Sequence, residues 1–382
     1  MRKAVTFIFI FFTAGRALAF DWEVKRFDGR DYAPLVKVAE FYSLPQQFSV
    51  ENNHISLYRG SRSLVVTRDL RDVEINGVKY ILSFPVIDRE GTYWISRMDI
   101  GKTIEPAFRP ELVADIKPFT TVVLDPGHGG HDNGASSPYE YEKNFSLDVA
   151  RRVRNELQKA GVNVFMTRNR DAFVELQDRA ALANGKQNSI FVSIHFNAAD
   201  WNHAANGLEI YCITPRGSPS TEYDELLVRD MVQETGNRNE TQSFALASII
   251  YQSLHGATLN MFDRGVKRAR FAVLRLTKAP AVLIEGGFLT NPDDARRVAT
   301  TSWRNDYAKA IARGILEYRK LAEFHQAPRT MADYRAPADT SPSISVTGTP
   351  SPTPVVNPIS LRDLPQASPS PTGQAQPSPS KP

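Results

Sequence analysis

The chain has 382 residues, of which 42% are hydrophobic and 23% charged, and Cys212 is its only cysteine. This composition is typical of a globular protein with room for two domains, and it excludes a wholly disordered, collagen-like or disulfide-stapled chain. The formal net charge of +4 falls to +1 without the three cations of residues 1–19. This excess of positive charge is too small to indicate binding to nucleic acid, so we expect no nucleic-acid partner.

Residues 1–19 have the features of an export signal. Arg2 and Lys3 precede an apolar run over residues 4–12, and residues 17–19 form a small-x-small cleavage site. The run is shorter than the roughly twenty apolar residues that span a bilayer, so we expect no stable membrane span. The sequence therefore predicts a periplasmic or secreted protein and does not distinguish the two destinations.

Residues 20–110 predict a small α+β domain. Alternating apolar and polar positions at 55–59 and 63–67 are typical of strands, and Asn76-Gly77 and Glu90-Gly91 are typical of the turns between strands. Residues 33–44 favour a helix with one apolar face. The region contains no cluster of histidines, no glycine-rich loop and no obvious acid–base pair. We therefore assign it no chemistry.

Residues 111–118 form the expected linker to a larger domain, residues 119–324, in which predicted strands alternate with predicted helices. The strands are expected at 121–124, 162–167, 190–195, 208–213 and 281–284, and the helices at 142–160, around 246–254 and at 303–321. This alternation favours an α/β fold, a mostly parallel open sheet with helices on both faces. Residues 215–242 fit neither period, so we expect a loop insertion there, with a short helix over 222–234.

The last segment, residues 325–382, has a different composition. From residue 327 onward it contains 13 of the 25 prolines, among repeats of Ser and Thr. A segment of this kind buries too little apolar surface to fold, so we expect a disordered tail.

A glycine-rich turn follows the first strand of the larger domain. Residues 125–130 read Asp-Pro-Gly-His-Gly-Gly and present His128 at the carboxyl end of the sheet, where open α/β folds place their ligands. The turn lacks the third glycine of a dinucleotide-binding loop and the Gly-Lys-Ser/Thr of a P-loop, which argues against nucleotide binding. The chain also lacks G-x-S-x-G and H-E-x-x-H, so a serine hydrolase and an ordinary zincin are disfavoured.

Three residues with metal-binding side chains are predicted to meet at this edge. His128 follows the first strand, Glu142 opens the next helix, and His195 ends the strand Ser189 to Asn197. Two imidazoles and a carboxylate are a common zinc ligand set that leaves a position open for water, so we predict a Zn²⁺ site. His131 and His203 are rival ligands. Each residue alone also fits a purely structural role, and their joint position favours the metal site.

Glu285 directly follows four apolar residues of a predicted strand. A buried carboxylate without a partner is costly, so we expect Glu285 to point into a polar site. There it can act as a general base that takes a proton from the attacking water. A salt bridge would explain Glu285 alone, but its position at the same sheet edge favours catalysis.

Seven motifs occur in order over residues 119–322. They are Asp125 to Gly130, Glu142-Lys143, Thr167-Arg168, Arg179 with Ala183-Asn184, Ser193 to Asn197, Arg264 to Lys267 and Glu285 to Phe288. In these motifs the chain resembles the zinc-dependent N-acetylmuramoyl-L-alanine amidases of the Amidase_3 type. The resemblance implies zinc held by His128, Glu142 and His195, with Glu285 as the catalytic carboxylate. Glu140 is a rival to Glu142, although the helix that follows favours Glu142.

The resemblance implies hydrolysis of the amide between N-acetylmuramic acid and L-alanine in peptidoglycan, for wall remodelling or daughter-cell separation. Some members carry an inhibitory helix that a partner removes, and residues 215–242 stand in the corresponding place. We therefore expect this insertion to border the active-site groove and to gate it, with an activator or division protein as a partner. Residues 20–110 resemble the small domains beside wall hydrolases, so we expect wall or partner binding. Two other functions stay open: a wall-binding protein without activity, and a zinc peptidase that cuts another wall amide.

Overall fold

The computed structural model describes residues 20–45, 49–257 and 259–328. The predicted export signal lies outside the described residues, as does almost all of the predicted tail. Within the described ranges, no helix is long and apolar enough to cross a membrane.

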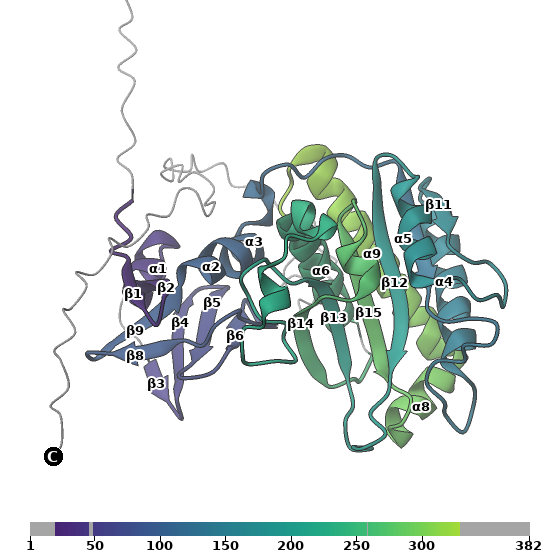
Figure 1. Cartoon of the computed structure of the whole chain (residues 1–382), viewed down its shortest axis with the longest axis horizontal. Coiled ribbons are helices and arrows are strands. Elements are labelled where there is room, and N and C mark those ends of the chain that lie inside the picture. Colours follow the sequence, from purple (N-terminus) through teal and green to yellow (C-terminus); the bar gives the residue numbers. More distant parts are fainter. Residues whose placement is uncertain (1–19, 46–48, 258, 329–382) are drawn as a thin grey trace, which may run out of the picture.

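An 11-stranded sheet is the main element of the molecule (Figure 1), with the strand order β11-β10-β12-β15-β13-β14-β7-β6-β5-β4-β3. Its strands are β3 (Ser49–Glu51), β4 (His54–Arg59), β5 (Arg62–Thr67), β6 (Asp72–Ile75), β7 (Val78–Ile81), β10 (Thr121–Pro126), β11 (Asn163–Met166), β12 (Ser189–Asn197), β13 (Leu208–Ile213), β14 (Asp263–Ala269) and β15 (Ala281–Phe288). A four-stranded sheet contains β1 (Lys25–Phe27), β2 (Arg30–Pro34), β9 (Thr92–Ser96) and β8 (Ile87–Arg89), in that order.

The C-terminal half of the large sheet is mostly parallel, as predicted. Strand β10 pairs in parallel with β11 and β12, β12 with β15, and β13 with β14, whereas β13 runs antiparallel to β15. The α-helices of the described residues are α1 (Leu35–Phe41), α2 (Arg97–Asp99), α3 (Glu105–Phe108), α4 (Glu142–Lys159), α5 (Leu176–Asn184), α6 (Glu240–His255), α7 (Ala272–Arg275), α8 (Pro292–Ala299) and α9 (Thr301–Phe324).

Helices cover both faces of this half of the sheet. Successive side chains of a strand point to opposite faces, and in the central strands both sets are apolar and pack against helices. In β10, Val122 and Leu124 pack into the core that contains residues of α4, α6 and α9. Val123, between them, packs into a second core with Ala183 of α5 and Leu274 of α7. The α/β architecture with helices on both faces is therefore confirmed.

The N-terminal strands extend the same sheet. Strands β3 to β7 form an antiparallel meander, and β7 then pairs in parallel with β14, where Tyr80 lies opposite Val266. In Figure 1 the blue strands of this meander lead into the green strands of the larger region. Asn76 and Gly77 both have positive φ, at 52° and 80°, as a tight hairpin turn requires. The division of the chain into separate domains stays a prediction.

Two expectations about secondary structure were incomplete. Strand β14 and helices α5 and α8 were not predicted, and β14 reads Asp-Arg-Gly-Val-Lys-Arg-Ala, whose charges hide a strand pattern. In the insertion, the helix expected over 222–234 is only a short 3₁₀ turn at Val228–Met231. A second 3₁₀ turn, Thr235–Asn239, leads into α6, which already begins at Glu240.

Candidate metal centre

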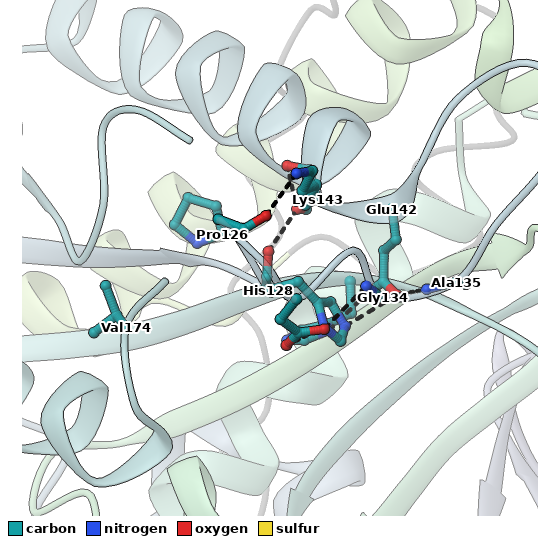
Figure 2. Close-up of polar contacts among 12 residues, drawn as sticks. Pro126, His128, Gly134, Ala135, Glu142, Lys143 and Val174 are labelled. Carbon is teal, nitrogen blue, oxygen red and sulfur yellow. Dashed lines mark hydrogen bonds and ion pairs between the residues drawn. The ribbon is translucent and has the colours of Figure 1, made fainter. Parts of the chain in front are cut away.

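The structure brings the side chains of His128, Glu142 and His195 together, and their potential ligand atoms all lie within 4.8 Å of one another. Figure 2 shows His128 and Glu142 of this group. His128 Nε2 is 3.0 Å from Glu142 Oε2, and His195 Nδ1 is 2.9 Å from Glu142 Oε1. The three residues come from the turn after β10, the first residue of α4 and the carboxyl end of β12, as the sequence predicted. Two ring nitrogens and a carboxylate at one point fit a zinc ion.

The turn that carries His128 is fixed by a buried arginine. Arg179 on α5 donates to the Asp125 carboxylate at 2.8 Å, and to the carbonyl oxygens of Pro126 at 2.6 Å and His128 at 2.7 Å. His128 itself has a φ of 60°, an uncommon conformation for a residue with a side chain. The three bonds from Arg179 hold this strained turn in place. From the sequence, Arg179 belonged to a motif but had no assigned role. The structure shows that it holds the turn.

Glycines leave room for the three side chains. A Cβ at Gly127 would overlap the imidazole ring of His195, and a Cβ at Gly134 would lie 2.5 Å from Glu142 Oε2. Figure 2 shows Gly134 and Ala135 against the Glu142 carboxylate, to which the Ala135 amide donates at 2.8 Å. The glycines of this turn therefore allow the three side chains to approach one another closely. They do not form a phosphate-binding loop.

Asp132 orients His128. Its Oδ2 lies 2.8 Å from His128 Nδ1, which leaves Nε2 facing Glu142. A carboxylate on the second ring nitrogen is the usual partner of a metal-binding histidine. Although burial opposes the imidazolium, Glu142 and Asp132 together raise the pKa of His128 above its ordinary value. Burial likewise opposes the ionised Glu142, but the two imidazoles hold its pKa well below the ordinary value.

Glu285 lies beside this cluster. It is paired in register with His195 on β12 and with Glu209 on β13, so the three side chains share one face of the sheet. Glu285 is partly exposed, but its Oε2 is buried and has no hydrogen-bond partner within the described residues. Burial, together with the charges of Glu142 and Glu209, raises the pKa of Glu285 well above its ordinary value. A divalent cation nearby would oppose that shift.

Sequence reasoning missed Glu209, which is 1% exposed. Its carboxylate accepts from Arg264 at 2.6 Å, from Asn197 at 2.7 Å, from the Tyr211 hydroxyl at 2.8 Å and from Lys267. Burial opposes ionisation, but these cations lower the pKa of Glu209 below its ordinary value. A charged residue inside the apolar run 208–213 was the available signal, together with the two cations of the Arg264 to Lys267 motif.

The rival ligands lie elsewhere. The His131 ring packs on Phe173, with 4.2 Å between ring centroids. His203 Nδ1 is 3.0 Å from the carbonyl oxygen of Thr290, and Glu140 is exposed at the surface. Within the described residues, only His128, Glu142 and His195 form a group that could hold a metal ion.

The insertion borders a cavity next to this cluster. The cavity has a volume of about 570 Å³, and its lining includes Asn197, Glu209 and Glu222. Glu222 belongs to the insertion. Arg71, in the N-terminal region, donates to the carbonyl oxygen of Tyr223 at 2.6 Å and thereby ties the insertion to the meander.

Comparison with known proteins gives one family. The family model described as N-acetylmuramoyl-L-alanine amidase, Amidase_3, matches residues 122–317, just over half of the chain. The N-acetylmuramoyl-L-alanine amidase AmiC of Neisseria meningitidis is 36% identical over 219 residues, which cover 52% of each protein. AmiA of Escherichia coli is 32% identical over 222 residues, or 52% of this chain and 75% of AmiA.

The matched region spans about half the length of the AmiC relatives, since it also covers only 58% of an Escherichia coli AmiC. Among solved structures, the amidase AmiC2 of Nostoc punctiforme is 35% identical, with a TM-score of 0.43. That match covers 52% of this chain and 96% of the solved chain.

Proposed function

Because the chain belongs to the N-acetylmuramoyl-L-alanine amidase family, Amidase_3, we propose that it hydrolyses the amide between N-acetylmuramic acid and L-alanine in peptidoglycan. The observation that carries this proposal is the convergence of His128, Glu142 and His195 beside Glu285. All four residues lie within the region that matches the family model.

The proposed metal ligands are His128, Glu142 and His195, and the proposed metal is zinc. A zinc ion held there would polarise the scissile carbonyl and make the attacking water more acidic. Asp132 keeps the His128 ring oriented, and the amides of Ala135 and Phe196 hold the Glu142 carboxylate at 2.8 and 3.1 Å.

Glu285 is the proposed general base and acid. Its carboxylate accepts a proton from the attacking water and then donates that proton to the amine of the leaving L-alanine. The buried Oε2 without a partner and the raised pKa both support a carboxylate that can hold a proton. Glu209 does not compete for this role, because Arg264 and Lys267 already neutralise it.

Digestion of purified peptidoglycan by the chain tests this function. The digest is run with and without a chelator, followed by zinc add-back, and new amines are identified by mass spectrometry. We expect peptides that begin with L-alanine, released only when zinc is present, and an intact glycan. Other new amino termini would indicate a zinc peptidase. No release, even after the insertion is trimmed, would indicate a wall-binding protein without activity.

We also propose that residues 215–242 gate the active site and respond to an activator or division protein. The position of Glu222 in the cavity beside Glu209 supports this role. Deletion of Ser218 to Asn239 should raise the activity on intact cell walls. Unchanged activity of a folded deletion variant would contradict gating.

Two further roles are proposed for the N-terminal part of the chain. Export to the periplasm or the exterior is proposed from residues 1–19, and cell-wall or partner binding is proposed for residues 20–110. Tyr58 and Val50 are exposed on this region, at 58% and 54%. If they contact the wall, replacing both by alanine in the full chain should reduce its sedimentation with peptidoglycan, and unchanged sedimentation would argue against that contact.

A further inference from the structure

The cavity beside the metal centre has the size of a ligand site. Its volume of about 570 Å³ lies within the roughly 300–1,000 Å³ that small-molecule sites occupy. Glu209 lines the cavity and lies opposite Glu285 in the register of β13 and β15. A substrate held over Glu285 therefore has this cavity as its neighbouring space.

Two exposed aromatic side chains lie at the cavity. Trp201 is 88% exposed and Phe262 is 61% exposed, and both belong to the cavity lining. The other three tryptophans of the chain, Trp22, Trp94 and Trp303, are buried. An exposed tryptophan beside a polar cavity is typical of a recognition surface, since large aromatic rings supply contact area at low conformational cost.

The rim that carries these rings is fixed to the body of the molecule. The amide of Ala199 donates to Thr290 Oγ1 at 3.0 Å, and His203 Nδ1 lies 3.0 Å from the Thr290 carbonyl oxygen. On the other side, the amide of Leu208 donates to the Phe262 carbonyl oxygen at 2.9 Å. The loop therefore presents Trp201 from an ordered backbone, which lowers the entropic cost of binding.

The charges in the cavity do not favour an anion. Arg264 and Lys267 are both bound to Glu209, and Glu222 adds a second carboxylate to the lining. With two cations and two carboxylates, the charged side chains of the lining have no net charge. An acidic stem peptide would have to displace existing ion pairs, whereas an uncharged ligand would not.

Three side-chain amides are also in the lining. Asn197, Asn202 and Asn206 all line the cavity. The Asn202 oxygen accepts from the Ala204 amide at 3.1 Å, and its NH₂ group has no partner within the described part of the chain. Such amides can both donate to and accept from hydroxyl and acetamido groups.

We propose that this cavity, with Trp201 at its rim, binds an N-acetylated sugar of the glycan strand. The flat face of the indole packs against the C–H face of the pyranose ring, and the NH₂ group of Asn202 binds its acetamido or hydroxyl oxygens. Asn197 and Asn206 already donate to Glu209 and to the Ala204 carbonyl oxygen. This inference rests on the proposed function, because it makes the cavity the glycan subsite of the same reaction. Trp201 is then a specificity-determining residue that selects a glycan-linked amide over a free peptide.

The test is binding of the N-acetylglucosamine tetramer to the full chain, measured by calorimetry and tryptophan fluorescence. Trp201 is the exposed tryptophan, so bound sugar should protect its fluorescence from a water-soluble quencher. We expect Trp201→Ala to weaken binding about tenfold or more, because tryptophan is among the side chains whose removal from a binding surface costs most. Trp201→Phe should retain most of the affinity, because it keeps a flat ring.

Phe324→Ala is the matched control, since Phe324 is 69% exposed at the end of α9; it should bind the tetramer as the parent chain does. Equal binding by Trp201→Ala, or no binding by the parent chain, would overturn the proposal. Protection of Trp201 by a sugar-free stem peptide and not by the tetramer would also overturn it. The tetramer lacks the amide between N-acetylmuramic acid and L-alanine, so its binding is independent of the proposed activity. An inactive chain that binds it through Trp201 would overturn only the proposed function.

Discussion

The two halves of the 11-stranded sheet differ in where their polar side chains gather. In the N-terminal half, β3 to β7 are joined in an antiparallel meander, and consecutive strands leave opposite ends of the sheet. In the C-terminal half, parallel strands bring residues distant in sequence to one edge, such as His195 and Glu285. The parallel strands therefore place the candidate site residues at one edge of the sheet, and the meander does not.

Buried carboxylates show the same contrast. Asp99 in the N-terminal region is fully buried, and its oxygens accept from the amides of Ser83 and Phe84 and from the hydroxyl of Ser96. Glu285 instead has a buried oxygen without a partner within the described residues. A carboxylate with all its partners stabilises the fold, whereas one without them is available for chemistry.

The largest expected effect comes from exchanging these two carboxylates for amides. Glu285→Gln should lower kcat about 10²- to 10⁴-fold, the usual contribution of a general base, with little change in Tm. Asp99→Asn should instead cost about 1–3 kcal/mol of stability, because buried donors lose their acceptor, with activity per folded molecule kept. Amidase assays and thermal melts of both variants check this. Full activity of Glu285→Gln would contradict the proposed role of Glu285.

Two glycines, one in each half of the molecule, test the close packing around Glu142. Gly134 and Gly91 both have positive φ, at 64° and 72°, but only a Cβ at Gly134 meets other atoms, those of Glu142 and His128. Both alanine variants should share a backbone cost of about 1–2 kcal/mol. Gly134→Ala should in addition weaken zinc binding about 10- to 100-fold, the scale of other disturbances around metal ligands. Zinc titration of both variants measures this, and equal affinities would contradict the close approach.

Asp132 tests the orientation of His128. Asp132→Asn removes a carboxylate that lies 2.8 Å from His128 Nδ1, and should weaken zinc binding about 10-fold, at the lower end of the usual effect of such partners. Asp88→Asn, at a half-buried pair in the N-terminal region with 4.0 Å between Asp88 and Arg68, is the control. Competition with a chelator of known affinity gives both values. Unchanged zinc affinity in Asp132→Asn would show that the contact does not support the metal site.

The smallest expected effect concerns the connection between the two halves. Arg71 donates to Leu82 and Tyr223, which joins the meander to the insertion. Arg71→Ala should cost about 1–2 kcal/mol, and the loss should be local. Hydrogen exchange should rise in residues 220–224. Lys25→Ala, which removes an exposed ion pair with Glu90, should change stability by less than about 1 kcal/mol. Unchanged exchange in Arg71→Ala would mean that the meander does not hold the insertion.

Sequence patterns predicted those elements whose apolar spacing is regular. The strand that ends at His195 and the helix that starts at Glu142 have clear periods, so the convergence of their ends followed from the topology. Strand β14 was missed because its cations pair with Glu209, a contact between distant parts of the chain. The pairing of β7 with β14 was equally unpredictable, since this short contact between distant parts of the chain leaves no mark in local spacing.

Zinc binding by the full chain and three variants, measured by equilibrium dialysis, tests the assignment of the metal centre most directly. The parent chain and Glu285→Gln should each bind a single zinc ion with similar affinity, whereas His195→Ala and Glu142→Ala should lose it. Glu285→Gln should then keep its zinc and still have the lowered kcat, because Glu285 moves the proton and does not hold the metal. Loss of zinc in Glu285→Gln, or full retention in His195→Ala, would contradict the assignment of the site.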